Sequence, residues 1–141
     1  MDLKNIQTPD KAICHLFLHC CFADGKFTDN EIDEVAEIFV KLGLQHDLDF
    51  KNELVEYRSY RNEIADEKDY LTYLINLIQP TNTRALLSYC LELAVSDAQL
   101  DILEEKFFRN LSEVLSIDKE DQKAIQDLMI ERKLVETNQF F

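Results

Sequence analysis

The sequence predicts an all-α protein of about seven helices, and three observations support this fold class. Glycine and proline occur only twice each in 141 residues, whereas a hairpin-rich β protein needs such turn residues at short, regular intervals. Apolar residues recur at helical spacing in most segments. Residues that cap helices stand in front of several of these segments. Because 46% of the residues are apolar, the chain can bury one core, and we expect residues 1–141 to form a single domain.

The first expected helix is apolar on almost every face. Thr8 is a good N-cap residue, and Pro9 after it suits the first helical position. From Ala12 to Ala23 polar residues are few, which is typical of a central, buried helix. The helix is expected to end at Asp24-Gly25, because this dipeptide favours a turn.

The second and third expected helices follow this acidic turn. Thr28 and Glu31 have the spacing of a capping box and open an amphipathic helix that ends at Gly43. Asp47 is expected to cap a third helix, which carries apolar residues at helical spacing. The pattern weakens in the polar stretch of residues 58–69, where we expect a loop.

Two shorter helices are expected in the middle of the chain. Residues 70–78 form a short apolar segment, which Pro80 ends because proline cannot continue a helix. Thr81 is expected to cap the next helix, over residues 82–95.

The last two helices are predicted from their starts. Asp101 and Glu104 have capping-box spacing before a segment with apolar residues on one face. Asp118 is expected to start the seventh helix. Residues 137–141 carry no helical signal.

The charge balance excludes some classes of partner. With 15 basic and 28 acidic side chains, the net charge is −13, which repels polyanions such as nucleic acid and anionic membrane surfaces. No apolar run is as long as a membrane span, so we expect no direct membrane insertion, and the N-terminus lacks a signal-peptide pattern. We therefore expect a cytoplasmic protein.

The four cysteines are expected to be buried thiols. Cys14, Cys20 and Cys21 lie in the first apolar segment without CxxC spacing, and Cys90 lies in a later one. Cysteine behaves as a small apolar residue, and the cytoplasm keeps thiols reduced. We expect no disulfide.

The chain contains an internal repeat. Displaced by 73 positions, since 97 − 24 = 73, it matches its own pattern of polar and apolar residues over more than thirty residues. The first copy covers about residues 9–44 and the second about 82–117. We expect two pseudo-symmetric units of helix, acidic turn and helix that pack about a pseudo-twofold axis. The pairs include Asp24 with Asp97, Phe27 with Leu100, Glu31 with Glu104, Val35 with Phe108 and Ile38 with Leu111.

The first turn also carries a family resemblance. The segment Phe22-Ala23-Asp24-Gly25-Lys26-Phe27-Thr28-Asp29-Asn30-Glu31 resembles the ADG-hydrophobic-x-x-x-E signature of TerB-like domains. These domains occur in tellurite-resistance proteins and at the front of DjlA-type co-chaperones. The resemblance implies a seven-helix intracellular domain with no established enzymatic chemistry, associated in some members with metal binding or stress responses. The second copy has Ala98 in place of Gly25, and no J-domain accompanies this chain, so a co-chaperone role is not supported.

Four carboxylates at the two turns are the candidate site: Asp24, Glu31, Asp97 and Glu104. Hard cations take oxygen ligands, so these residues could hold calcium, magnesium or manganese, or bind a basic partner. The alternative is structural, because Glu31 and Glu104 occupy the position of a capping box that bonds the N-cap amide.

His15 and His19 lie four residues apart on the first helix. This spacing can hold zinc when a third ligand approaches, but on so apolar a helix we expect both imidazoles to be packed and hydrogen-bonded. A set of tyrosines and arginines has two interpretations, either an interface or a partly buried cluster, of which we favour the second. The set is Tyr57, Tyr60, Tyr70, Tyr73, Arg58 and Arg61.

The sequence contains no GxSxG motif and no glycine-rich phosphate loop. We therefore predict a binding or adaptor domain with a protein partner and not an enzyme. The alternative is a metal-dependent hydrolase that uses clustered carboxylates and histidines.

Overall fold

The computed structural model describes residues 3–23, 29–44, 48–95, 100–138 and 141, with the side chains of residues 29–31 left out. These residues contain seven α-helices, one 3-10 turn and no strand, which confirms the predicted all-α class. None of the described helices has the length and apolarity needed to cross a membrane. The elements are α1 (Pro9–Cys21), α2 (Asp29–Leu42), α3 (Phe50–Tyr60), η1 (Arg61–Glu63), α4 (Glu67–Ile78), α5 (Thr83–Ala94), α6 (Ile102–Val114) and α7 (Lys119–Asn138).

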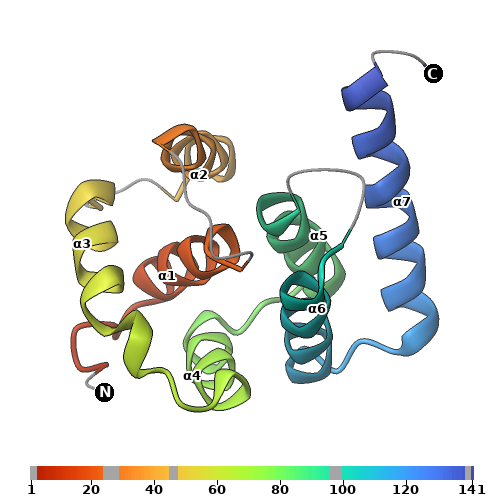
Figure 1. Cartoon of the computed structure of the whole chain (residues 1–141). Coiled ribbons are helices and arrows are strands. Elements are labelled where there is room, and N and C mark those ends of the chain that lie inside the picture. The colour runs from red at the N-terminus through yellow and green to blue at the C-terminus, as the bar shows by residue number, and fades with distance from the viewer. Residues whose placement is uncertain (1–2, 24–28, 45–47, 96–99, 139–140) are drawn as a thin grey trace.

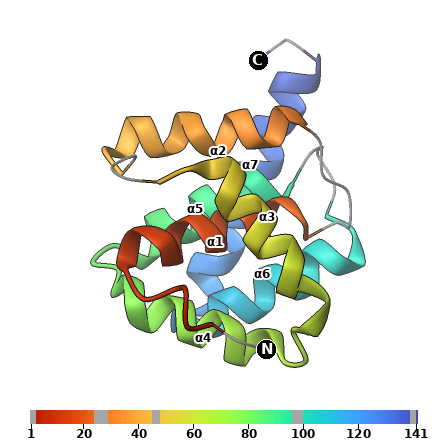
Figure 2. The same cartoon turned by 90° about the vertical axis from the view of Figure 1, so that its left-hand side faces the viewer.

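Helix α1 is the central element of the fold, as its apolar sequence predicts. It packs against α2, α3, α4 and α5, and Figure 2 shows α2 and α4 on opposite sides of it with α3 lying across it. The Thr8 hydroxyl caps the helix by accepting a hydrogen bond from the Lys11 amide (3.3 Å). All side chains from Cys14 to Cys21 are buried.

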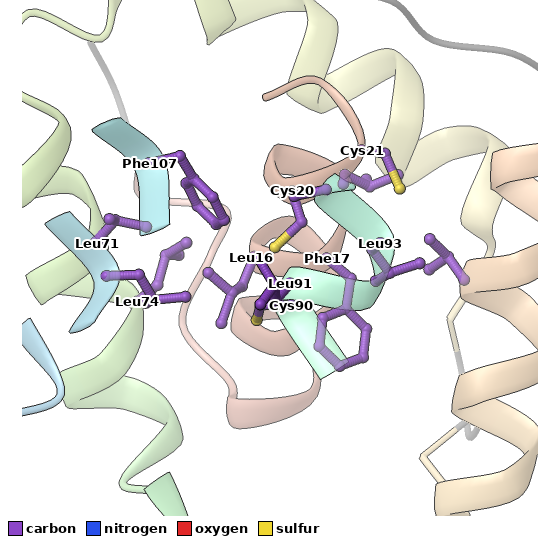
Figure 3. Packing of buried hydrophobic residues seen from close by; sticks show 14 of the residues in the cluster. Leu16, Phe17, Cys20, Cys21, Leu71, Leu74, Cys90, Leu91, Leu93 and Phe107 are labelled. Atoms are coloured by element: carbon purple, nitrogen blue, oxygen red, sulfur yellow. The ribbon is translucent and has the colours of Figure 1, made fainter. Parts of the chain in front are cut away.

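The core is built around α1 and α5. Figure 3 shows side chains of α1 and α5 interleaved, with α4 and α6 contributing on one side. All four cysteines are buried, as expected from their apolar surroundings. The labelled members of this core are Leu16, Phe17, Cys20, Cys21, Leu71, Leu74, Cys90, Leu91, Leu93 and Phe107.

Helix α7 forms the outer wall of the molecule on the side away from α3. It packs against α5, and its end carries the C-terminus far from the N-terminus (Figure 1). Met129 is the one buried residue described in this helix. The helix runs to Asn138, so the expectation that residues 137 and 138 are not helical was wrong.

Two predicted caps were wrong by one or two residues. Helix α3 is capped by Asp49, whose carboxylate accepts from the amides of Lys51 (3.1 Å) and Asn52 (3.4 Å). The predicted cap, Asp47, is two residues too early for such contacts and lies outside the described residues. Helix α5 is capped by Asn82 and not by Thr81.

The loop predicted over residues 58–69 is shorter in the structure. Helix α3 continues to Tyr60, and η1 extends the helical turn to Glu63. Helix α4 begins at Glu67, because the Asp66 side chain caps it by accepting from the Asp69 amide (3.2 Å). The polarity of this stretch therefore reflects exposure on short helices and not a long loop.

The helices of the two sequence repeats begin and end at corresponding positions. When 73 is added to the bounds of α1, the result is 82–94, and α5 covers residues 83–94. When 73 is added to the bounds of α2, the result is 102–115, and α6 covers residues 102–114. Gly43 and Ser116, also 73 apart, both have positive φ, at 70° and 57°. The pseudo-twofold relation between the copies stays a prediction.

The hydrogen bonds at these two helix ends also correspond. The Leu44 amide donates to the Phe39 carbonyl (2.9 Å), and the Ile117 amide donates to the Ser112 carbonyl (3.0 Å). Both pairs span five residues around a left-handed residue, which is the pattern of a Schellman motif. The two units therefore end their second helices in the same way.

Candidate functional site

Only part of the predicted acidic site belongs to the described residues. Asp24 and Asp97 lie outside them, and of Glu31 the backbone is described but the side chain is not. Glu104 is buried, and its Oε1 accepts from the Asp101 amide (2.9 Å). The Asp101 carboxylate in turn accepts from the Glu104 amide (2.7 Å), so the second predicted capping box is confirmed. The cation site stays a prediction.

The two histidines of α1 face different partners. His15 is fully buried, with Nδ1 2.6 Å from the Tyr60 hydroxyl and Nε2 3.2 Å from Oε1 of Glu53. The Tyr60 ring stacks on the imidazole at a centroid distance of 5.7 Å, and its hydroxyl lies 2.6 Å from that of Tyr70. The Lys11 ammonium is 3.8 Å from Glu53. His15 is thus held between a phenol and a carboxylate, both supplied by α3.

Burial controls the ionisation of His15 and Glu53. It lowers the pKa of His15 to about 4, because a charged imidazolium loses its hydration in the core. Burial also raises the pKa of Glu53 above its usual value of 4.5. His15 is therefore neutral at pH 7, which leaves one ring nitrogen with a lone pair.

Glu56, one helical turn after Glu53 on α3, completes a group of possible metal ligands with His15. One ligand atom from each of these three residues lies within 4.8 Å of the other two. His15 and Glu53 are buried, and Glu56 is half-buried.

His19 has a similar arrangement one turn further along α1. Its Nδ1 lies 2.8 Å from the Tyr57 hydroxyl and its Nε2 lies 2.8 Å from Oε2 of Glu67. Asn110 on α6 donates a hydrogen bond to Oε1 of Glu67 (2.8 Å). Although burial acts to raise the pKa of Glu67, the hydrogen bonds from His19 and Asn110 outweigh it, so the pKa is below its usual value.

An open pocket of about 400 Å³ adjoins His19 and Glu67. Phe22, Tyr57 and Phe107 supply aromatic walls, and Arg61 and Lys106 supply positive charge. The Arg61 guanidinium lies 4.6 Å from the centre of the Phe22 ring and donates to the Phe22 carbonyl (3.4 Å). The pocket therefore combines aromatic walls with cationic side chains and with the polar pair of His19 and Glu67.

Comparison with known families agrees with this architecture. A family model described as tellurite resistance protein TerB matches residues 10–127, from the first turn of α1 into α7. The chain belongs to the TerB family. No curated protein and no solved structure shows detectable similarity to this TerB domain.

Three tyrosines of the TerB domain belong to the core. Tyr57, Tyr60 and Tyr70 are buried, whereas Tyr73 is partly buried and its hydroxyl donates to the Ile6 carbonyl (2.7 Å). The interpretation as a partly buried cluster is confirmed for these tyrosines. The hydroxyls of the three buried tyrosines are also bonded inside the protein.

Sequence reasoning missed the two glutamates that bond the histidines. Glu53 and Glu67 lie in polar segments, where a carboxylate is ordinarily exposed. One signal was available, because Glu53, Tyr57 and Tyr60 recur at helical spacing and so share one face of α3. This face matches the spacing of His15 and His19 on α1.

Proposed function

We propose that this TerB domain is a binding module without catalytic activity that takes up a divalent cation at its two acidic turns. Asp24, Glu31, Asp97 and Glu104 supply the oxygen ligands, and calcium, magnesium or manganese is the cation. A protein partner binds the domain in the cytoplasm, in a stress response such as tellurite resistance.

The correspondence between the two units is the observation that carries this proposal. Helices α1 and α2 flank the first turn at the same positions as α5 and α6 flank the second, displaced by 73 residues. Equal flanking helices support equivalent roles for Asp24 and Asp97. Carboxylates brought near each other repel, and a bound cation removes that repulsion.

The net charge of −13 supports a basic protein surface as partner and not a nucleic acid. The TerB family is not a family of known enzymes. We therefore favour a binding role over a metal-dependent hydrolase.

Calorimetric titration with calcium, magnesium and manganese, each alone, tests the cation site. The wild type is expected to bind one of them at millimolar concentration or below, with a rise in melting temperature by mass action. The double variant Asp24→Asn with Asp97→Asn is expected to fold and to lose that rise.

A matched control is the double variant Asp33→Asn with Asp127→Asn, which removes two exposed carboxylates from α2 and α7. It should keep the cation-dependent rise. Absence of binding by the wild type at millimolar concentration would leave Glu31 and Glu104 as helix caps and rule out the cation site.

A further inference from the structure

We propose that His15, Glu53 and Glu56 form a zinc site between α1 and α3, separate from the acidic turns. Two of the three side chains are buried, and their ligand atoms already lie within 4.8 Å of one another. Helix α3 packs directly on α1, so the backbone holds both sides of the group in place (Figure 2).

To bind zinc, the three ligand atoms must come slightly closer together, and the side chain that has to move is Glu56. Ligand atoms around a tetrahedral zinc ion are about 3.4 Å apart, given bonds of about 2.1 Å. His15 Nε2 and Glu53 Oε1 are already 3.2 Å apart. Glu56 is half-buried at the edge of the group. A change of its rotamer can bring its carboxylate oxygen closer to the ligand atoms of His15 and Glu53, and its exposed part leaves a path for the ion.

The donor set favours zinc over the cations proposed for the acidic turns. Imidazole nitrogen and carboxylate oxygen are both zinc ligands, and three protein ligands are the number in an open zinc site, in which water takes the fourth position. Calcium and magnesium prefer oxygen ligands alone and in larger number.

The hydrogen bonds behind His15 suit a metal ligand. A histidine that binds metal through Nε2 usually donates its Nδ1 proton to a neighbour that fixes the ring. The Tyr60 hydroxyl lies 2.6 Å from Nδ1 and can accept this proton while it donates to Tyr70. Without metal, an ionised Glu53 accepts from Nε2, and Nδ1 can then accept from the Tyr60 hydroxyl. The phenol pair therefore accommodates both tautomers.

The charges around the group leave a place for a cation. Glu53 and Glu56 carry two negative charges when ionised, and the Lys11 ammonium lies 3.8 Å from Glu53. That distance is too long for a hydrogen bond, and the Lys11 side chain is 35% exposed. Zinc can displace it, because the lysine can turn into solvent.

Titration of the full chain with zinc by calorimetry tests the site. We expect one zinc ion to bind the wild type and Glu56→Gln to weaken binding at least about tenfold. Lys11→Met is expected to tighten zinc binding, because it removes the competing ammonium. A purely structural His15–Glu53 contact would not produce this gain.

Two controls separate this site from others. Glu63→Gln removes an exposed carboxylate near the end of α3 and should leave zinc affinity unchanged. The Asp24→Asn, Asp97→Asn variant should also keep it, so failure of the cation site at the turns would not affect this result. Cobalt in place of zinc should give the weak visible bands of nitrogen and oxygen ligands.

Three outcomes would overturn the proposal. Zinc affinity that is unchanged in Glu56→Gln would place the ion elsewhere. Zinc affinity lost in the Asp24→Asn, Asp97→Asn variant would assign it to the turns. Intense near-ultraviolet bands of cobalt bound to thiolate would assign it to the cysteines.

Discussion

His15 and His19 show how an apolar helix accommodates polar side chains. A buried polar group destabilises the fold unless it is hydrogen-bonded, and each imidazole here meets one phenol and one carboxylate. The phenols also supply apolar ring area, so the network is packed as well as bonded. The polar residues of α1 thus fix how α3 and α4 lie against it.

The Glu67 carboxylate should make stability depend on pH. Its pKa in the folded protein is below 4.5, so its contribution is fully present above pH 4.5 and is lost as the pH falls through the folded pKa. In Glu67→Gln the free energy of unfolding should therefore fall less steeply between pH 4.5 and pH 3 than in the wild type. Urea unfolding at a series of pH values measures both slopes.

Glu63→Gln is the matched control for this prediction, because Glu63 is exposed in the turn before α4. It should keep the wild-type slope. Parallel curves for wild type and Glu67→Gln would show that hydrogen bonds from His19 and Asn110 do not hold the carboxylate ionised.

At the scale of the element, the ends of α2 and α6 differ in the residue used for the same backbone conformation. Glycine adopts positive φ without a penalty, whereas a residue with a Cβ atom is strained there by about 1 kcal/mol. Gly43 occupies this position after α2 and Ser116 after α6. The backbone is therefore more strained at Ser116 in the second unit than at Gly43 in the first.

Exchanging these residues gives opposite predictions. Ser116→Gly should stabilise the protein by up to about 1 kcal/mol, and Gly43→Ala should destabilise it by about 1 kcal/mol. A Cβ atom at Gly43 would meet nothing within 4 Å, so the expected loss comes from backbone strain alone. Chemical denaturation measures both changes. Equal signs for the two variants would contradict a shared left-handed cap.

At the scale of the whole molecule, α1 should dominate stability because it packs against α2, α3, α4 and α5. Leu16 is fully buried at its centre (Figure 3). Leu16→Ala removes buried apolar volume and should lower the free energy of unfolding by about 2–5 kcal/mol. Thermal or urea unfolding gives the value.

Val55→Ala is the comparison, since Val55 is 70% exposed on α3 and its truncation should change stability by less than about 0.5 kcal/mol. A loss at Leu16 no larger than at Val55 would contradict the central position of α1.

The sequence by itself determined the helices and their order. Capping residues and apolar periodicity depend only on neighbours in the chain, so Thr8, the Asp101–Glu104 box and Asp118 could be recognised directly. The repeat was also visible, because it rests on spacing. Two caps were misplaced where two candidate residues stood close together, Asp47 and Asp49 in one case and Thr81 and Asn82 in the other.

The tertiary structure alone decided which polar residues meet. The partners of His15 and His19 lie 38 to 48 residues away in the chain, on α3 and at the start of α4. Such contacts depend on how helices cross, which local patterns do not encode. Glu53 and Glu67 were therefore overlooked, because a glutamate in a polar segment is ordinarily exposed until a neighbouring helix covers it.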